Sequence, residues 1–141
     1  MVRRVIEYQL FSVLMVNATG DKLEHRLSVK LGENIQIRRD IPVGEGITGR
    51  AMATKEAVVA KDVREDPRYI MVNPDVRSEL AVPLIHKGEV WGVLDLEHVK
   101  KNYYTERHAR TISTLAAHTA LCTAGVRPSR SSRYAMTSPF P

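Results

Sequence analysis

Hydrophobic and polar residues follow two different patterns in the first thirty positions, and each pattern predicts a β-strand. Residues 8–16 are almost continuously apolar and rich in strand-favouring side chains, which is typical of a central, buried strand. Residues 23–31 alternate instead, which predicts a strand with one solvated face. The side chains expected to face inward are Leu23, His25, Leu27, Val29 and Leu31. Turn-forming residues at 17–21 separate the two strands, so we predict a β-hairpin.

The middle of the chain predicts one short helix and three more strands. The glycines between residues 44 and 49 suit a tight entry into a helix, and Gly49 would let that helix approach the sheet. The loop at 63–75 contains an apolar island at 69–72, which we expect to dock on another part of the molecule. The predicted strands are 57–60, 78–85 and 90–96, and Pro83 inside one of them indicates an edge position or a bulge.

A second helix is predicted from Thr105, which is a good N-cap, and its apolar stripe repeats at helical spacing until Gly125. Residues 126–141 are rich in Ser, Arg and Pro without periodicity, which predicts a disordered basic tail after one domain at 1–125. Because hairpins dominate the order of elements, we expect a mainly antiparallel sheet with helices packed on it, an α+β fold.

Composition and charge narrow the classes of function. The chain of 141 residues carries a net charge of +5, but its last 17 residues supply +3 of that, so the body is nearly balanced and we expect no nucleic-acid partner. No apolar run approaches the roughly 20 residues that span a bilayer, so we expect no membrane partner. With Cys122 as the single cysteine there is no internal disulfide, and we expect a cytoplasmic location.

Four segments in this order resemble pieces of the GAF family of sensory domains. They are residues 41–50, 57–63, 76–84 and 88–96. The resemblance covers about residues 8–125 and implies a six-stranded antiparallel sheet with helices on both faces, a PAS-like sandwich. It also implies a small-molecule pocket, a sensory role in bacterial signal-transduction proteins, and a homodimer through the terminal helices. Family members usually begin with a longer helix than residues 1–6 allow and continue into an effector domain, so we expect a short or truncated first helix.

The pocket is expected between the strands at 78–85 and 90–96 and the loop at 63–75, where it would bind an unknown small ligand. Arg77 either holds a carboxylate or phosphate with its planar guanidinium or pairs with a neighbouring charge and anchors the loop. Asp95 either reaches the ligand or caps a loop. The predicted ligand-binding residues are Tyr69, Ile70, Arg77, Ser78, Leu80, Val82 and Asp95.

The residues that carry chemistry favour a binding module over an enzyme. Some GAF-type proteins reduce free methionine sulfoxide, which needs one thiolate to attack and a second thiol to resolve the sulfenic acid. Cys122 lies on the last helix, and the expected pocket holds no cysteine, so we predict no enzyme activity and no catalytic residue. A divergent free methionine sulfoxide reductase and a ligand-free interaction module are the alternatives.

The five histidines lack the close spacing of a metal site on one helix face. His25, on the inward face of its strand, is either a haem or metal ligand or a hydrogen-bonded interior histidine. From the sequence we therefore expect no cofactor and no metal.

Overall fold

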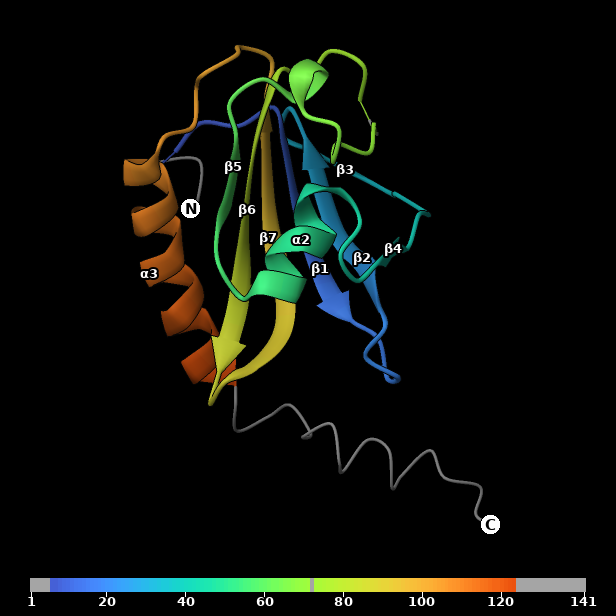
Figure 1. Cartoon of the computed structure of the whole chain (residues 1–141), viewed down its shortest axis with the longest axis vertical. Coiled ribbons are helices and arrows are strands. Elements are labelled where there is room, and N and C mark those ends of the chain that lie inside the picture. The colour runs from blue at the N-terminus through green and yellow to red at the C-terminus, as the bar shows by residue number, and fades with distance from the viewer. Residues whose placement is uncertain (1–5, 72, 124–141) are drawn as a thin grey trace.

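One antiparallel sheet forms the centre of the molecule (Figure 1). The computed structural model describes residues 6–71 and 73–123. The strands are β1 (Leu10–Val16), β2 (Lys22–Lys30), β3 (Glu33–Ile35), β4 (Ile41–Pro42), β5 (Val58–Ala60), β6 (Ser78–His86) and β7 (Glu89–His98). Their order is β3-β2-β1-β7-β6-β5, and β4 pairs with β2 beside this path. Every pair of strands is antiparallel, so the predicted α+β fold is confirmed, with β4 as a short seventh strand.

Two helices cover opposite faces of the sheet, as Figure 1 shows. The first, α2 (Gly46–Thr54), packs Ile47 and Ala51 against Leu14 and Val93. The second, α3 (Glu106–Thr123), packs Ala109, Ile112 and Ala116 onto the other face. A single 3-10 turn, η1 (Val63–Glu65), lies between β5 and β6. None of the helices in the described part of the chain is long and apolar enough to cross a membrane.

Alternation along β6 and β7 sorts their side chains between these two faces. Glu79 lies opposite Glu97 and Ala81 lies opposite Asp95, whereas Leu80 lies opposite Leu96. Because directly opposed residues in an antiparallel pair share a face, Glu79, Asp95 and Glu97 all point to the α2 side. Leu80 and Leu96 point to the α3 side, where they join its apolar core.

The predicted alternation of β2 is wrong beyond His25. Val13 of β1 pairs with Leu27, but Leu14 pairs with His25, so Arg26 is an extra residue in the ladder. Such a bulge exchanges inward and outward positions for the rest of the strand. Leu27 is therefore 45% exposed, while Ser28 is buried and its hydroxyl lies 2.9 Å from that of Ser12.

The environments of two residues singled out in the sequence agree with their predicted roles. A Cβ at Gly49 would lie 2.5 Å from the carbonyl oxygen of Pro42, so the glycine allows α2 to approach β4 closely. Pairing of β5 with β6 ends at Ala81, so Pro83 has a strand on only one side, as expected for a proline in a strand.

Other predictions fall on residues outside the description. These residues are 1–5, the end of the last predicted helix at 124 and 125, and the predicted basic tail at 126–141. The short first helix therefore remains a prediction. The homodimer through the terminal helices and the cytoplasmic location also remain predictions.

Candidate functional site

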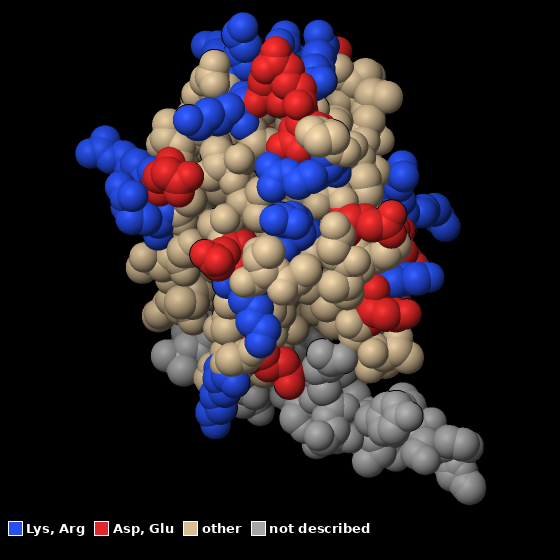
Figure 2. All heavy atoms as spheres, in the orientation of Figure 1, with Lys and Arg blue, Asp and Glu red and all other residues tan. Residues whose placement is uncertain are grey.

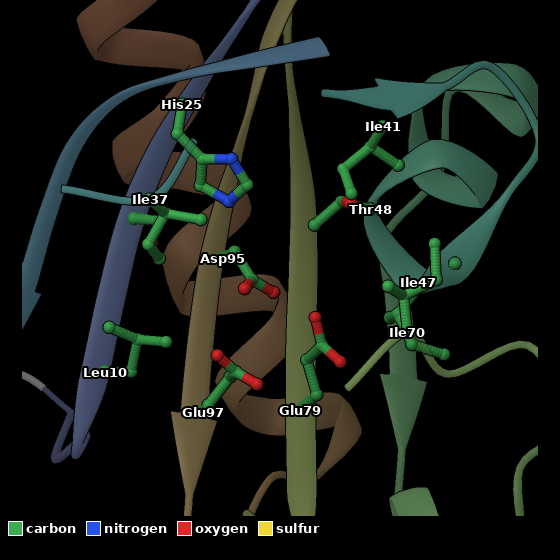
Figure 3. Close-up of a pocket in the computed structure, with 12 residues that line it drawn as sticks. Leu10, His25, Ile37, Ile41, Ile47, Thr48, Ile70, Glu79, Asp95 and Glu97 are labelled. Atoms are coloured by element: carbon green, nitrogen blue, oxygen red, sulfur yellow. The ribbon is translucent and has the colours of Figure 1, made fainter. Parts of the chain in front are cut away.

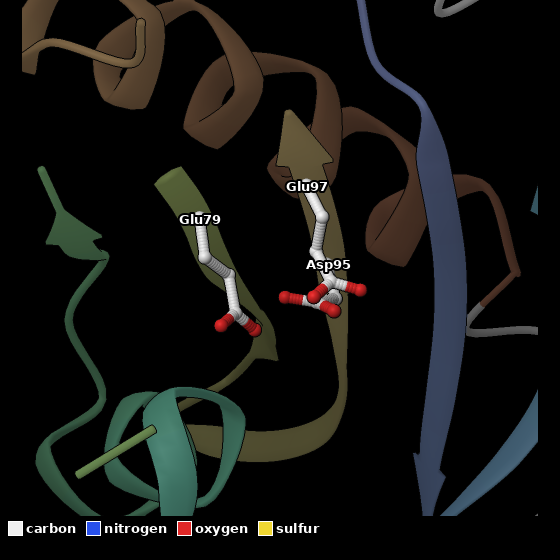
Figure 4. Close-up of side chains that lie close together, drawn as sticks. All are labelled: Glu79, Asp95 and Glu97. Carbon is white, nitrogen blue, oxygen red and sulfur yellow. The ribbon is translucent and has the colours of Figure 1, made fainter. Parts of the chain in front are cut away.

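Three buried carboxylates meet on the α2 side of the sheet (Figure 4). Glu79 on β6 and Asp95 and Glu97 on β7 each offer an oxygen, and these oxygens lie within 4.8 Å of one another. The three residues are only 5%, 6% and 2% exposed, respectively. Strand register produces the cluster. Glu79 on β6 lies directly opposite Glu97 on β7, and Asp95 lies two residues before Glu97 on β7, so its side chain points to the same face.

The carboxylates line a small cavity between the sheet, α2 and two loops (Figure 3). Its volume is about 20 Å³, which is enough for one water-sized body. Ile37, Ile41 and Ile70 close it on the apolar side. The polar lining consists of the three acids together with Ser12, His25 and Thr48.

Gly46 makes room for one wall of this cavity. Its φ of +66° lies in the left-handed region that glycine adopts readily, and a Cβ there would lie 2.8 Å from Cδ1 of Ile70. The glycine at the start of α2 therefore serves the contact between helix and loop that covers the carboxylates. Ile70 belongs to the apolar island at 69–72, for which the sequence predicts docking on another part of the molecule, and its side chain lines the cavity.

Burial dominates the electrostatics of the acidic cluster. It raises the pKa of Glu79 and of Glu97 well above the usual range, and the negative charge of Asp95 raises both further. Burial also raises the pKa of Asp95, to about 6. The Tyr69 hydroxyl donates to Glu97 Oε1 at 3.3 Å. A hydrogen bond between the carboxyl groups of Glu79 and Asp95 raises the pKa of Glu79 and lowers that of Asp95. Asp95 Oδ1 has no hydrogen-bond partner among the described residues, so the site still holds one unsatisfied acceptor.

His25 reaches into the cavity from β2, and Figure 3 shows its imidazole extending toward Asp95. Its Nδ1 lies 2.8 Å from the carbonyl oxygen of Arg39. A carbonyl can only accept, so Nδ1 carries the hydrogen. In the neutral ring Nε2 then has a lone pair and acts as an acceptor or ligand. Burial lowers the pKa of His25, which favours this neutral form.

The seven predicted ligand-binding residues do not all lie together. Ile70 and Asp95 line the cavity, and Tyr69 contacts it through Glu97. The Arg77 guanidinium pairs with Asp62 at 2.9 Å, which is the local, loop-anchoring arrangement.

The other predicted residues lie elsewhere in the strand. Ser78 donates to the carbonyl oxygen of Lys100 at 2.7 Å. Leu80 and Val82 pack beneath α3 on the opposite face of the sheet, because even-numbered positions of this strand face away from the acids.

The predicted ligand-binding residues do not include Glu79 or Glu97. The signal that could have found Glu97 is its position two residues after Asp95 on an otherwise apolar strand, which places both on one face. Glu79 lies two residues before Ala81 on its strand, so these two side chains also share a face. Their meeting depends on the register between two strands, which the sequence of either strand alone does not contain.

The concentrated negative charge lies inside the molecule. On the face shown in Figure 2, basic and acidic side chains are interspersed and neither sign forms a continuous patch. The buried acids therefore distinguish this site from the ordinary mixed surface around it.

Comparison with known proteins places this arrangement in a family. A family model described as "GAF domain" matches residues 2–123. A free methionine-R-sulfoxide reductase from Saccharomyces cerevisiae is 33% identical over 82 residues, which are 52% of this chain and 45% of that protein. The Escherichia coli protein of the same name is 30% identical over 77 residues, 55% of this chain and 47% of that protein. The chain spans about half the length of these curated relatives.

Solved structures agree with the fold. A free methionine-R-sulfoxide reductase from Neisseria meningitidis, in complex with its substrate, superposes with a TM-score of 0.73 at 27% identity and covers 82% of this chain and 66% of that one. The GAF domain of a phosphoenolpyruvate-protein phosphotransferase from Coxiella burnetii has a TM-score of 0.75 at 19% identity, with 89% of this chain and 77% of that chain covered. The second likeness shows the fold alone.

These matches correct one prediction. The sequence analysis predicts no enzyme activity from the absence of a pocket cysteine, but several of the relatives and structural neighbours are GAF-fold reductases. Membership of this fold family therefore gives no ground for excluding catalysis.

Proposed function

This chain belongs to the GAF family, and from that premise we propose that it binds a small ligand carrying a positive charge. The observation that carries the proposal is the buried cluster of Glu79, Asp95 and Glu97. Three acids at this spacing repel one another and lose hydration on folding. A cationic group placed among them would relieve both penalties, so the site favours such a group over a neutral one.

The cavity in its closed form is too small for an organic molecule, but a larger groove adjoins it. This groove, of about 210 Å³, is lined by Ser28, Ile35 and Arg38, and it shares His25 and Ile37 with the carboxylate cavity. Displacement of the half-buried Ile37 side chain would join the two spaces. A molecule of amino-acid size could then hold its ammonium group at the acids and extend its side chain along the groove.

Free methionine sulfoxide is the ligand we propose to test first. The reductases named above act on this compound according to their names, and the substrate complex is of a protein 27% identical to this chain. The compound carries the primary ammonium that the acidic cluster would recognise. In this proposal the domain is sensory or regulatory, and ligand binding changes the covering loops and the pairing of terminal helices.

Isothermal titration calorimetry tests this proposal with three compounds. Free L-methionine sulfoxide should bind saturably, whereas N-acetyl-L-methionine sulfoxide, which lacks the positive charge, should not. D-glucose serves as a neutral control of similar size. Equal binding of the free and acetylated sulfoxides would contradict the proposed recognition of a cation.

Matched variants locate the binding site. Asp95→Asn keeps the shape of the side chain and removes its charge, so it should weaken binding by about tenfold or more, as loss of a charged partner usually does. Glu33→Gln makes the same kind of change on an exposed residue of β3 and should leave the affinity unchanged. Equal effects of the two substitutions would place the binding elsewhere.

The matches also favour a second candidate, reduction of the bound sulfoxide. A thiolate takes the sulfoxide oxygen to give free methionine and a sulfenic acid, and a second thiol then forms a disulfide with release of water. Cys122 is the only cysteine in the chain, and its helix packs on the face opposite the cavity, so an added dithiol must supply the rest. Methionine production with dithiothreitol by the wild type, and its loss in Cys122→Ser, would support this candidate. Full activity of Cys122→Ser would end it.

A further inference from the structure

We infer that the cluster of Glu79, Asp95 and Glu97 also binds a divalent metal ion when no organic cation occupies it. The spacing of the donor atoms is the first reason. One oxygen of each acid lies within 4.8 Å of the other two, and two oxygens bound to one Ca²⁺ at about 2.4 Å can be at most about 4.8 Å apart, so this spacing is compatible with one ion bound by all three.

The unsatisfied oxygen of Asp95 is a second, separate reason. Asp95 is 6% exposed, its Oδ1 has no hydrogen-bond partner among the described residues, and Figure 4 shows its carboxylate turned toward the other two. Buried polar atoms are nearly always paired with protein, water or an ion. An ion at the centre of the cluster would give this oxygen a ligand bond.

Cavity size separates the metal ion from the organic ligand. The closed cavity, of about 20 Å³, admits one water-sized body without any movement of Ile37 or Ile70. A dehydrated metal ion therefore fits the structure as it stands, whereas the organic ligand requires opening. The two occupants use the same carboxylates and should compete.

His25 lines the same cavity, although it is not one of the residues whose ligand atoms lie within 4.8 Å of one another. Histidines that bind metals usually donate their other ring N–H to a backbone carbonyl or carboxylate, and Nδ1 of His25 makes this contact with Arg39. Its Nε2 is the atom left for the cavity. Three carboxylates alone suit Ca²⁺, whereas an added imidazole would favour Mn²⁺. The expectation of no metal comes from histidine spacing. The ligands of this site are carboxylates, and the register between β6 and β7 brings them together.

Titration of the chelator-treated full chain with CaCl₂ and with MnCl₂ tests the inference. We expect saturable binding of one ion per chain and a rise in melting temperature. Asp95→Asn and Glu97→Gln should each weaken binding by about tenfold or more, and Glu33→Gln should have no effect. His25→Phe should weaken Mn²⁺ binding by about tenfold and leave Ca²⁺ binding unchanged if the imidazole is a ligand.

Two results would overturn the inference. One is the absence of saturable binding of either ion at millimolar concentration, and the other is binding that Asp95→Asn leaves unchanged. Circular dichroism of each variant checks that it is folded before binding is measured.

Adding L-methionine sulfoxide to the same samples separates this inference from the proposed function. Metal binding without sulfoxide binding would support the metal site and contradict the proposed ligand. Sulfoxide binding without metal binding would do the reverse. Displacement of the metal by the sulfoxide is the outcome expected if both are correct.

Discussion

The two faces of the central sheet are built from the same strands and each carries an apolar core, but the α2 face also buries three acids. On the α3 side, Leu80, Val82 and Leu96 pack with Ile112 in an apolar core. On the α2 side, neighbouring positions of the same two strands carry Glu79, Asp95 and Glu97, all buried. Figure 1 shows one helix on each face, the longer α3 on one side and the shorter α2 on the other. What differs is whether the alternate positions are apolar or acidic.

This difference shows where the fold gains its stability and where it loses some. Burial of apolar side chains stabilises the folded state, whereas burial of unpaired acids opposes it. Functional sites often carry such a cost, since a site that binds a charge must hold the opposite charge ready. We therefore expect the α3 face to stabilise the domain and the α2 face to bind its ligand.

Removing apolar volume from the α3 face should have the largest effect. Ile112→Ala, at a position only 1% exposed, should lower the free energy of unfolding by about 2–5 kcal/mol because it removes buried contacts and leaves a cavity. Urea unfolding followed by circular dichroism measures the loss. Affinity for the sulfoxide and for Ca²⁺ should not change under native conditions. A loss below about 1 kcal/mol, or a loss of binding, would contradict the division between the faces.

Neutralising the α2 face should have the opposite sign. Asp95→Asn should raise the free energy of unfolding by about 1–3 kcal/mol at pH 7.5, because it removes a buried carboxylate whose ionisation burial disfavours and adds an amide that can donate to the other two acids. The same urea experiment measures it, with Glu33→Gln as the control that should change little. A less stable Asp95→Asn protein would mean that the cluster supports the fold and would break the comparison.

The pH dependence of stability follows from the same acids. The pKa values of Glu79, Asp95 and Glu97 are raised in the folded protein, so the folded state binds more protons than the unfolded state above about pH 4. Their contribution to stability is therefore greatest at low pH and is lost as the pH rises through the folded values. For Asp95, with a pKa of about 6, the loss falls between about pH 4 and 6.

Unfolding curves at a series of pH values measure this trend. The wild type should lose stability between about pH 4 and 7 relative to Asp95→Asn, whose curve should be flatter in that range. Saturating CaCl₂ should restore part of the loss at neutral pH, because a bound ion stabilises the ionised cluster. If the free energy of unfolding of the wild type rose over this pH range as steeply as that of Asp95→Asn, the raised pKa values of the three acids would be contradicted.

The smallest effect concerns the contact that covers the acids. Gly46→Ala should destabilise the domain by about 1–2 kcal/mol through its positive φ, and its Cβ should also displace Ile70. Gly88→Ala is a matched control, since Gly88 has a φ of +76° and no atom within 4 Å of an added Cβ. Thermal unfolding should show a larger loss for Gly46→Ala. Only Gly46→Ala should change the affinity for Ca²⁺, and an equal effect of both would contradict the role of Ile70.

Much of the fold could be predicted from sequence because it rests on local patterns. Alternation, turn residues and the helical stripe from Ala109 onward identified five of the seven strands and both α-helices in the described part of the chain. The two strands that they missed, β3 and β4, are three and two residues long and pair only with β2. Arg26 shows the limit of this reasoning. A bulge in β2 is a property of its pairing with β1, so the outward turn of Leu27 could not be deduced from the alternating residues.

The candidate site was harder to predict for the same reason. Asp95 and Ile70 were identified because strand period and an apolar loop are local signals. Glu79 and Glu97 join them only through the register of β6 on β7. Leu80 and Val82 were included because the sequence predicts the pocket beside their strand, but both side chains face the α3 side, away from the cavity.

Direct measurement of the three carboxyl pKa values tests the central claim most closely. NMR titration of ¹³C-labelled side-chain carboxyl groups resolves Glu79, Asp95 and Glu97, with Glu33 as an exposed reference. We predict values above the usual range for all three in the free protein, and a fall toward that range when L-methionine sulfoxide or Ca²⁺ saturates the site. Ordinary pKa values in the free protein, unchanged by either compound, would contradict the account of a buried acidic cluster that binds cations.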